Sequence, residues 1–218
     1  TENTRIETRF PSNLTYCIYK YKTDNMITTK TLIIHPQDKS TIFLNDIYMN
    51  IPNKTVVQGG ISKIDVTKLI KSHDRIMMMG HGSPAGLFSV GQFKHTGGSN
   101  GFYGGGYIID QSMVSMLNEK DNNVFIWCNA DKFVDLFGLK GFYSGMFISE
   151  VGEATYCGLP GTKQETVDES NYGFVNIIGK YINEPTGIIY ENVRNEYGII
   201  AEKNDVAEYN HMRLYAAE

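Results

Sequence analysis

A histidine and a cysteine each follow an apolar run, and together they could perform nucleophilic chemistry. His81 lies in the stretch GHGS (80–83) after the run Ile76–Met79, and Cys128 follows the run Val124–Trp127. A thiol attacks a carbonyl carbon as the thiolate, and a nearby imidazole can accept or share its proton. The two residue types therefore form a candidate catalytic pair.

The elements before these residues would have to bring them together. A short, unbroken apolar run closed by glycine predicts a strand buried on both faces, as in a parallel sheet. Such strands end at the edge where open α/β sheets bind their ligands. Glycine at position 82 lets the backbone approach a substrate closely, so the N–H groups of Gly82 and Cys128 could form a two-donor oxyanion hole.

The same residues also have a structural interpretation. A histidine followed by glycine after a strand is often a packing or turn feature. A free cysteine at the end of an apolar strand is often a small buried hydrophobic residue. The presence of both His81 and Cys128 at the ends of successive strands adds weight to the catalytic interpretation. Both interpretations stay open at this point.

The first half of the chain alternates predicted strands and helices. Strands are expected at 28–34, 54–57 and 76–79, with a helix through Tyr48 capped by Asp38 or Ser40 and another that begins at Ser62. This alternation predicts a mainly parallel sheet with right-handed crossovers, in a three-layer α/β/α sandwich. We expect one domain over residues 1–218, with 1–27 as an N-terminal hairpin extension whose strand 14–21 pairs with 28–34.

The second half contains a glycine-rich tract and several helices. Leu87–Phe93 could form a small hairpin strand, and residues 97–106 predict a loop, either a mobile flap over the site or a surface spacer. Helices are expected after Asp110 and over residues 133–136, 145–156 and 171–182, with an exposed polar connection at 160–171. Residues 188–190 and 209–217 are ambiguous between strand and helix.

Composition restricts the class of protein. The chain has 218 residues, 41% of them hydrophobic, which suffices for one core, and its net charge of −4 argues against nucleic acid as a partner. No apolar stretch is long enough to cross a bilayer, so no membrane partner is expected. Three cysteines (Cys17, Cys128 and Cys157) fit a reducing compartment, which predicts a cytoplasmic protein, with export after leader removal left open. No residues have zinc-site spacing, and neither a metal nor a cofactor is predicted.

A strand followed by His81-Gly82, and 128 − 81 = 47 residues later a strand followed by Cys128, resembles cysteine peptidases of the caspase-haemoglobinase type. This group includes caspases, metacaspases, legumains, gingipains and separases, and the stretch GHGS is most similar to gingipains and other bacterial members. The resemblance covers about residues 28–160. It implies a caspase-like fold and a peptidase that cleaves protein or peptide substrates through a thioester. It makes His81 the general acid/base, Cys128 the nucleophile, and the N–H groups of Gly82 and Cys128 the oxyanion donors.

The chain departs from the family pattern next to the nucleophile. Trp127 stands where many relatives have a small residue, and Ile126 stands where caspases have the glutamine of an aspartate-specific pocket. No preference for aspartate is therefore implied. Ser83, Trp127 and Asp131 are the candidate substrate-pocket residues, although the position of Asp131 favours a helix-capping role over substrate binding. An inactive caspase-like binding or scaffold module, or a small amide or ester hydrolase with the same dyad, are the alternatives. The oligomeric state is not predicted.

Overall fold

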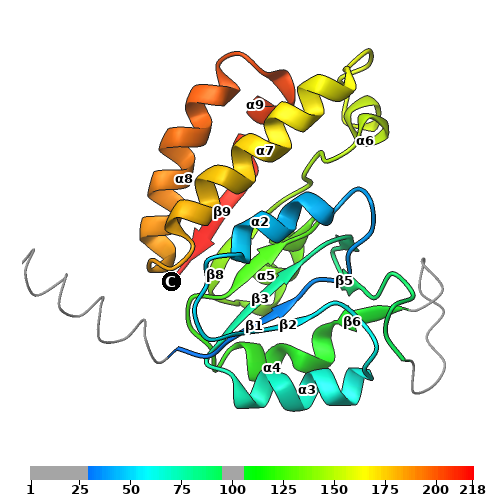
Figure 1. Cartoon of the computed structure of the whole chain (residues 1–218), viewed down its shortest axis with the longest axis vertical. Coiled ribbons are helices and arrows are strands. Elements are labelled where there is room, and N and C mark those ends of the chain that lie inside the picture. The colour runs from blue at the N-terminus through cyan, green and yellow to red at the C-terminus, as the bar shows by residue number, and fades with distance from the viewer. Residues whose placement is uncertain (1–28, 95–105) are drawn as a thin grey trace, which may run out of the picture.

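Apolar runs form the central sheet of the protein. The computed structural model describes residues 29–94 and 106–218, and within them six strands lie in the order β2, β1, β3, β7, β8, β9 (Figure 1). The first five are parallel, and the edge strand β9 runs antiparallel to β8. The bounds are β1 (Thr31–Ile34), β2 (Lys54–Val57), β3 (Arg75–Met79), β7 (Val124–Ile126), β8 (Gly141–Ser144) and β9 (Leu214–Ala217).

The inner strands are covered on both faces. Every residue of β1, β3, β7 and β8 is buried, whereas the edge strand β2 is mostly exposed. Uninterrupted burial explains why the inner strands contain continuous apolar runs instead of alternating apolar and polar residues. The predicted strand at 54–57 and the Met-rich strand before His81 are confirmed.

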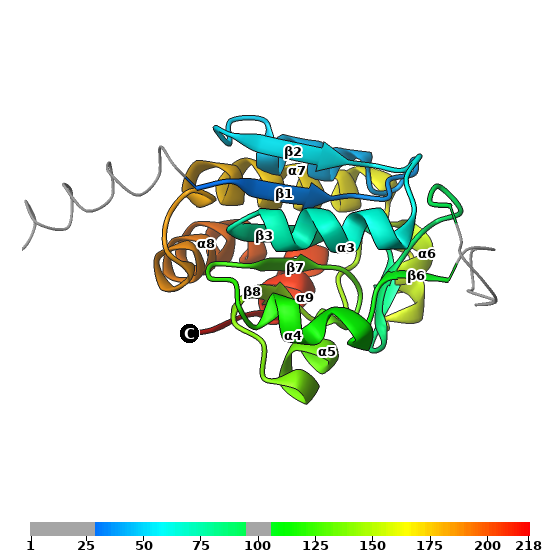
Figure 2. The ribbon, with the colours of Figure 1, turned by 90° about the horizontal axis from the view of Figure 1, so that it is seen from below.

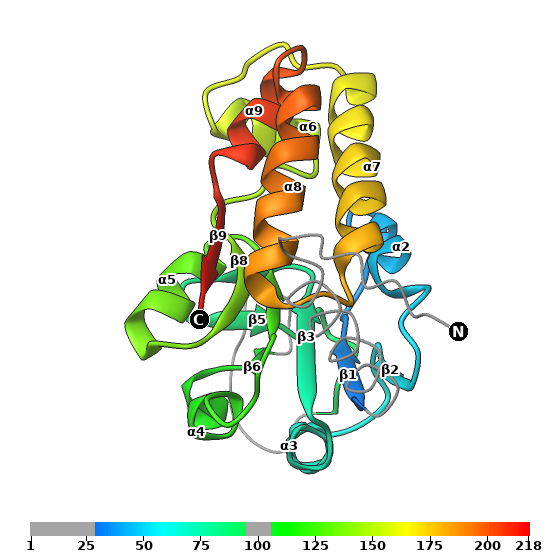
Figure 3. The same ribbon diagram turned by 90° about the vertical axis from the view of Figure 1, so that its left-hand side faces the viewer.

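Helices pack on both faces of this sheet, so the protein is an α/β protein. One face is covered by α2, α7 and α8, which pack on Met77, Met79 and Ile126, and α9 adds Ala207 to the same core. The other face is covered by α3, α4 and α5, which pack on Ile76, Met78 and Phe125. Figure 2 looks onto the second face, with α7 and α8 behind the sheet, and Figure 3 shows the two groups of helices on opposite sides. The arrangement is compatible with the predicted three-layer sandwich.

The helices begin and end as follows. On the first face are α2 (Asn45–Tyr48), α7 (Gln164–Tyr181), α8 (Thr186–Ala201) and α9 (Asp205–His211), with a 3-10 turn at Ile42–Leu44 before α2. On the second face are α3 (Lys63–Ser72), α4 (Val114–Leu117) and α5 (Ala130–Phe137), with a 3-10 turn at Gln111–Met113 before α4. The short helix α6 (Val151–Tyr156) packs against α7 and α9 in a separate small cluster.

Local capping signals account for several of these boundaries. Ser62 accepts a hydrogen bond from the N–H of Asp65 at the start of α3, and Asp110 accepts one from the N–H of Ser112. Gly138 ends α5 with φ +59°, a conformation in which glycine has no steric penalty. The expected cap before Tyr48 is wrong, because Thr41 precedes the 3-10 turn and makes no side-chain cap.

A second, three-stranded antiparallel sheet follows His81 directly. It consists of β4 (Gly82–Ser83), β5 (Gly86–Phe88) and β6 (Tyr107–Ile109), in that order. The hairpin strand expected at 87–93 is thus shorter and ends at Phe88. A side chain on Gly86 would overlap with the carbonyl oxygen of Ile109, so the strands can approach this closely only with glycine there.

Two boundaries in the second half were predicted wrongly. The helix expected at 145–156 begins only at Val151, because residues 141–144 pair with β7 and β9 as the strand β8. The polar connection expected at 160–171 is largely helical, since α7 begins at Gln164 and buries Val167 and Ser170. Of the ambiguous stretches, 188–190 lies in α8, and 209–217 is divided between α9 and β9.

Some expectations fall on other parts of the chain. The predicted strand 14–21, the hairpin extension 1–27, Cys17 and nearly all of the glycine-rich tract lie outside the described residues. β1 has parallel partners on both sides, β2 and β3, which leaves it no free edge for the antiparallel partner of a hairpin. Among the described helices, none is long and apolar enough to cross a membrane.

Candidate active site

His81 and Cys128 reach the same side of the sheet because β3 and β7 are neighbours in register. Met79 pairs with Ile126, and the Gly80 N–H donates to the Ile126 carbonyl at 3.0 Å. His81 and Cys128 each lie two residues beyond this pair, just past the ends of β3 and β7. The structure therefore brings the two predicted residues together.

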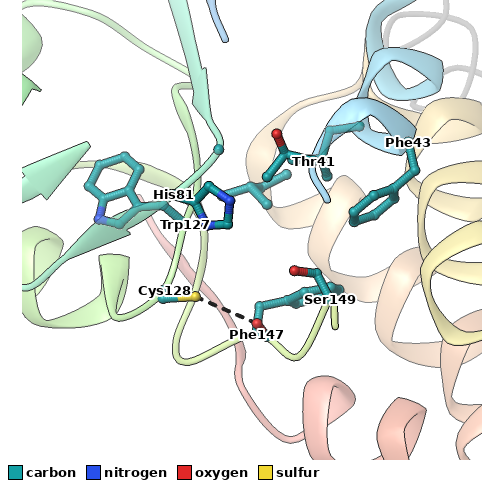
Figure 4. Close-up of a pocket in the computed structure, with 10 residues that line it drawn as sticks. Thr41, Phe43, His81, Trp127, Cys128, Phe147 and Ser149 are labelled. Carbon is teal, nitrogen blue, oxygen red and sulfur yellow. Dashed lines mark hydrogen bonds between the residues drawn. The ribbon is translucent and has the colours of Figure 1, made fainter. Parts of the chain in front are cut away.

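Both residues line one small pocket at the carboxyl ends of the parallel strands (Figure 4). The pocket has an empty volume of about 300 Å³, part of it open to solvent. Its walls come from the segment after β1, from the ends of β3 and β7, and from the segment after β8. The lining residues are Thr41, Phe43, Leu44, Gly80, His81, Ile126, Trp127, Cys128, Phe147 and Ser149.

The imidazole of His81 is held by Asp38, which sequence reasoning assigned only to a helix cap. Its Nε2 lies 2.9 Å from Asp38 Oδ2 and 2.8 Å from Ser40 Oγ, and Ser40 donates to Asp38 Oδ1 at 2.7 Å. With a carboxylate as acceptor, Nε2 carries the hydrogen. Asp38 follows β1, which is the neighbour of β3 on the side opposite β7. Its place after a predicted strand is the sequence signal that could have assigned it to the site.

Asp38 is ionised at neutral pH. Burial disfavours its charge, but the hydrogen bond from Ser40 and the interactions with His81 outweigh burial and lower the pKa of the carboxyl group. The anionic carboxylate accepts the hydrogen bond from the imidazole and so fixes the orientation of the ring. The pair resembles the base and orienting group of a nucleophilic triad in its chemistry.

The thiol of Cys128 points toward the segment after β8. Its Sγ lies 3.6 Å from the carbonyl oxygen of Phe147 and 3.7 Å from Glu153 Oε1 (Figure 4 shows the first contact). Burial, followed by the negative charge of Glu153, raises the pKa of Cys128 to about 12. At neutral pH the thiol is therefore protonated in this arrangement.

The segment after β8 adds carboxylates to the site. Glu153 Oε2 accepts hydrogen bonds from the N–H of Ser149 at 2.7 Å and from its hydroxyl at 3.0 Å. Burial and then the charge of Glu153 raise the pKa of Glu150, while the charge of His81 acts in the opposite direction. Sequence reasoning missed both glutamates, because only the tertiary fold places α6 beside Cys128.

Gly82, the expected oxyanion donor, is not among the residues that line the pocket, and it has a packing role. Phe88 N–H donates to the His81 carbonyl at 2.8 Å, so the adjacent pair Gly82–Leu87 exchanges no hydrogen bonds, and the Gly82 N–H points away from β5. A side chain on Gly82 would overlap with the Trp127 indole. The glycine is thus required by packing, whatever its part in chemistry.

The three candidate substrate-pocket residues lie differently from one another. Trp127 contributes to the pocket lining, but its indole is buried in the core of the opposite face, donates to the Ser83 carbonyl at 3.1 Å, and points away from the pocket in Figure 4. Ser83 hydrogen-bonds to the Tyr107 hydroxyl at 2.8 Å, and Asp131 lies in the first turn of α5 beside Lys132. Neither Ser83 nor Asp131 is among the pocket-lining residues.

Over the ranges 29–94 and 106–218, the side chains form no cluster of three or more potential metal ligands. Comparison with models of protein families, with curated proteins and with solved structures gives no match. The chemistry of the site is therefore argued from its own geometry.

Proposed function

We propose that this protein is a cysteine endopeptidase with a caspase-like fold, in which Cys128 is the nucleophile and His81 the general acid/base. One observation carries the proposal: both residues follow neighbouring strands and line one pocket, with Asp38 on Nε2 of the imidazole. The strand–loop–helix–strand connection between His81 and Cys128 also agrees with the resemblance to caspase-haemoglobinase peptidases.

The reaction would proceed by acyl transfer. The Cys128 proton moves to the imidazole of His81, and Sγ bonds to the carbonyl carbon of the scissile peptide. The resulting imidazolium, hydrogen-bonded to Asp38, protonates the leaving amine as the C–N bond breaks. Water, deprotonated by His81, then hydrolyses the thioester and releases the free thiol.

The negative charge on the tetrahedral intermediate requires donors. The N–H groups of Gly82 and Cys128 follow the two strand ends, and the Gly82 N–H is turned away from the β4–β5 ladder. One such donor is typically worth on the order of 3 kcal/mol of transition-state stabilisation. Side-chain mutation cannot remove a backbone donor, so the proposal is tested through the dyad.

A second candidate function is a binding module that keeps this fold without catalysis. The raised pKa of Cys128, about 12, favours it, because a protonated thiol is a poor nucleophile. In that case the pocket would bind a peptide without cleaving it.

A mixed synthetic peptide library separates the two functions. Mass spectrometry should detect new peptide ends with the parent protein, and Cys128→Ala should abolish them. Asp38→Asn should lower kcat on the order of 10- to 100-fold, the value of one charge-assisted hydrogen bond. Cys157→Ala is the cysteine control: Cys157 does not line the pocket, so this variant should still produce the new peptide ends. Peptide binding without cleavage by the folded parent, or cleavage that survives Cys128→Ala, would contradict the proposal.

A further inference from the structure

One carboxylate connects the thiol of Cys128 to the pocket wall. Glu153 Oε1 contacts Cys128 Sγ at 3.7 Å, and Oε2 accepts both hydrogen bonds from Ser149. Phe147, in the same wall, offers its carbonyl to the same sulfur at 3.6 Å. The thiol and the segment 147–149 are therefore joined through one side chain of α6.

The wall itself is anchored to the protein core. Asn210 of α9 donates to the Ile148 carbonyl at 2.9 Å and accepts from the Ile148 N–H at 2.7 Å. Both Ile148 and Asn210 are fully buried. This double hydrogen bond holds the segment, and with it the acceptors for the thiol, in a defined place.

The surroundings of the thiol mostly oppose a negative charge on it. Burial, Glu153 of α6 and Cys157, the residue after that helix, raise the pKa of Cys128, whereas the hydrogen bond to the Phe147 carbonyl acts in the opposite direction. Tyr209 of α9 interacts with both cysteines, and Arg213 lies 3.5 Å over the Tyr209 ring. His81 and Asp38 face the site from the segments after β3 and β1, and Glu150 interacts with both. The groups that disfavour a thiolate at this position therefore outweigh the one that favours it.

We infer that Glu153 is a resting-state latch, which holds the protonated Cys128 thiol against the segment 147–149 until a peptide in the pocket displaces that contact. A thiol has one proton to donate, so its donation to Glu153 or Phe147 competes with transfer to His81. Phe147 and Ser149 line the pocket, and a bound peptide would contact the same wall that carries the latch. The displacement of this contact by a peptide rests on the proposed function, whereas the contact between Glu153 and the thiol does not.

The latch is tested by the rate at which iodoacetamide alkylates Cys128 at several pH values, read by mass spectrometry of the peptide that contains it. Glu153→Gln removes the charge and should lower the apparent pKa of Cys128, with up to about a tenfold faster reaction at neutral pH for each unit of decrease. Glu165→Gln, on the exposed start of α7, is the matched control and should react like the parent.

Glu153→Asp is a second variant, which tests the inference if Glu153→Gln does not fold. It keeps the charge but shortens the side chain by one methylene, so it should give a smaller acceleration than Glu153→Gln. Equal or slower alkylation in both variants, or equal acceleration in Glu165→Gln, would overturn the inference. Peptide cleavage is measured separately. Faster alkylation of Glu153→Gln without any peptide cleavage by the parent would support the latch and contradict the peptidase proposal. Peptide cleavage by the parent with unchanged alkylation of Glu153→Gln would support the peptidase proposal and contradict the latch.

Discussion

At the scale of single residues, the tryptophan before Cys128 and the glycine after His81 explain each other. The indole of Trp127 is 1% exposed and occupies the space that a side chain at position 82 would need. Its Nε1–H donates to the Ser83 carbonyl at 3.1 Å and so connects the end of β7 to β4. A large residue at 127 is therefore compatible with the site, because its bulk is turned away from the pocket.

Gly82→Ala should destabilise the protein, because the added Cβ would overlap with Trp127 and lie 2.7 Å from the Gly86 carbonyl oxygen. Overpacking of this kind costs on the order of 1–3 kcal/mol of unfolding free energy, which urea denaturation measures. Gly152→Ala in α6 is the control: its Cβ meets nothing within 4 Å, and alanine is the better helix former. Equal stability of Gly82→Ala and the parent would show that the tryptophan does not fix this position.

At the scale of elements, sequence patterns predict helix boundaries that depend on residues close in the chain. They fail where pairing between distant segments determines the secondary structure. The caps at Ser62 and Asp110 and the helix end at Gly138 depend on residues within a few positions, and all were predictable. Residues 141–144 form a strand because β7 and β9 offer partners on both sides. Tertiary pairing overrides local propensity there, and Ser144 donates to the Trp127 carbonyl and caps no helix.

The connection from β1 to α2 contains a buried histidine that should make stability depend on pH. His35 is fully buried, and its Nδ1 donates to the Tyr48 hydroxyl at 3.0 Å, while that hydroxyl donates to Asn45. Its Nε2 meets no hydrogen-bond partner within the described part of the chain. Burial is the main cause that lowers the pKa of His35 from 6.5 to about 4.

Because the unfolded chain binds this proton more readily, the His35 contribution is complete above about pH 6.5 and is lost as the pH falls toward 4. Between about pH 7 and pH 5, we expect His35 to account for a loss of about 2 kcal/mol in unfolding free energy. Urea denaturation of the parent and of His35→Gln at both pH values measures it. The variant keeps the other titrating groups, among them His211, so the difference in pH dependence isolates His35. The same dependence in both proteins would contradict this assignment.

At the scale of the whole molecule, the sheet explains why part of the site was predictable. His81 and Cys128 each follow an apolar run that the sequence displays, and the parallel register then places them side by side. Asp38 and Glu153 could not be assigned in this way. Asp38 lies in a loop beyond β1 with local hydrogen bonds that look like a cap, and Glu153 reaches the pocket only through the position of α6. The α/β class, the neighbouring strands β3 and β7 and the shared pocket of His81 and Cys128 followed from pattern, whereas the side chains that contact these two residues depend on tertiary packing.

The most direct test of the account is a double-mutant cycle on a peptide that the protein cleaves. kcat/KM is measured for the parent, Cys128→Ala, His81→Ala and the double variant, with unfolding midpoints recorded to confirm that each is folded. Residues that act as one unit in the same step are strongly non-additive. The account predicts that each single variant loses nearly all activity and that the double variant is no slower than the slower single one. Losses that multiply in the double variant, or an unchanged rate in either single variant, would contradict it.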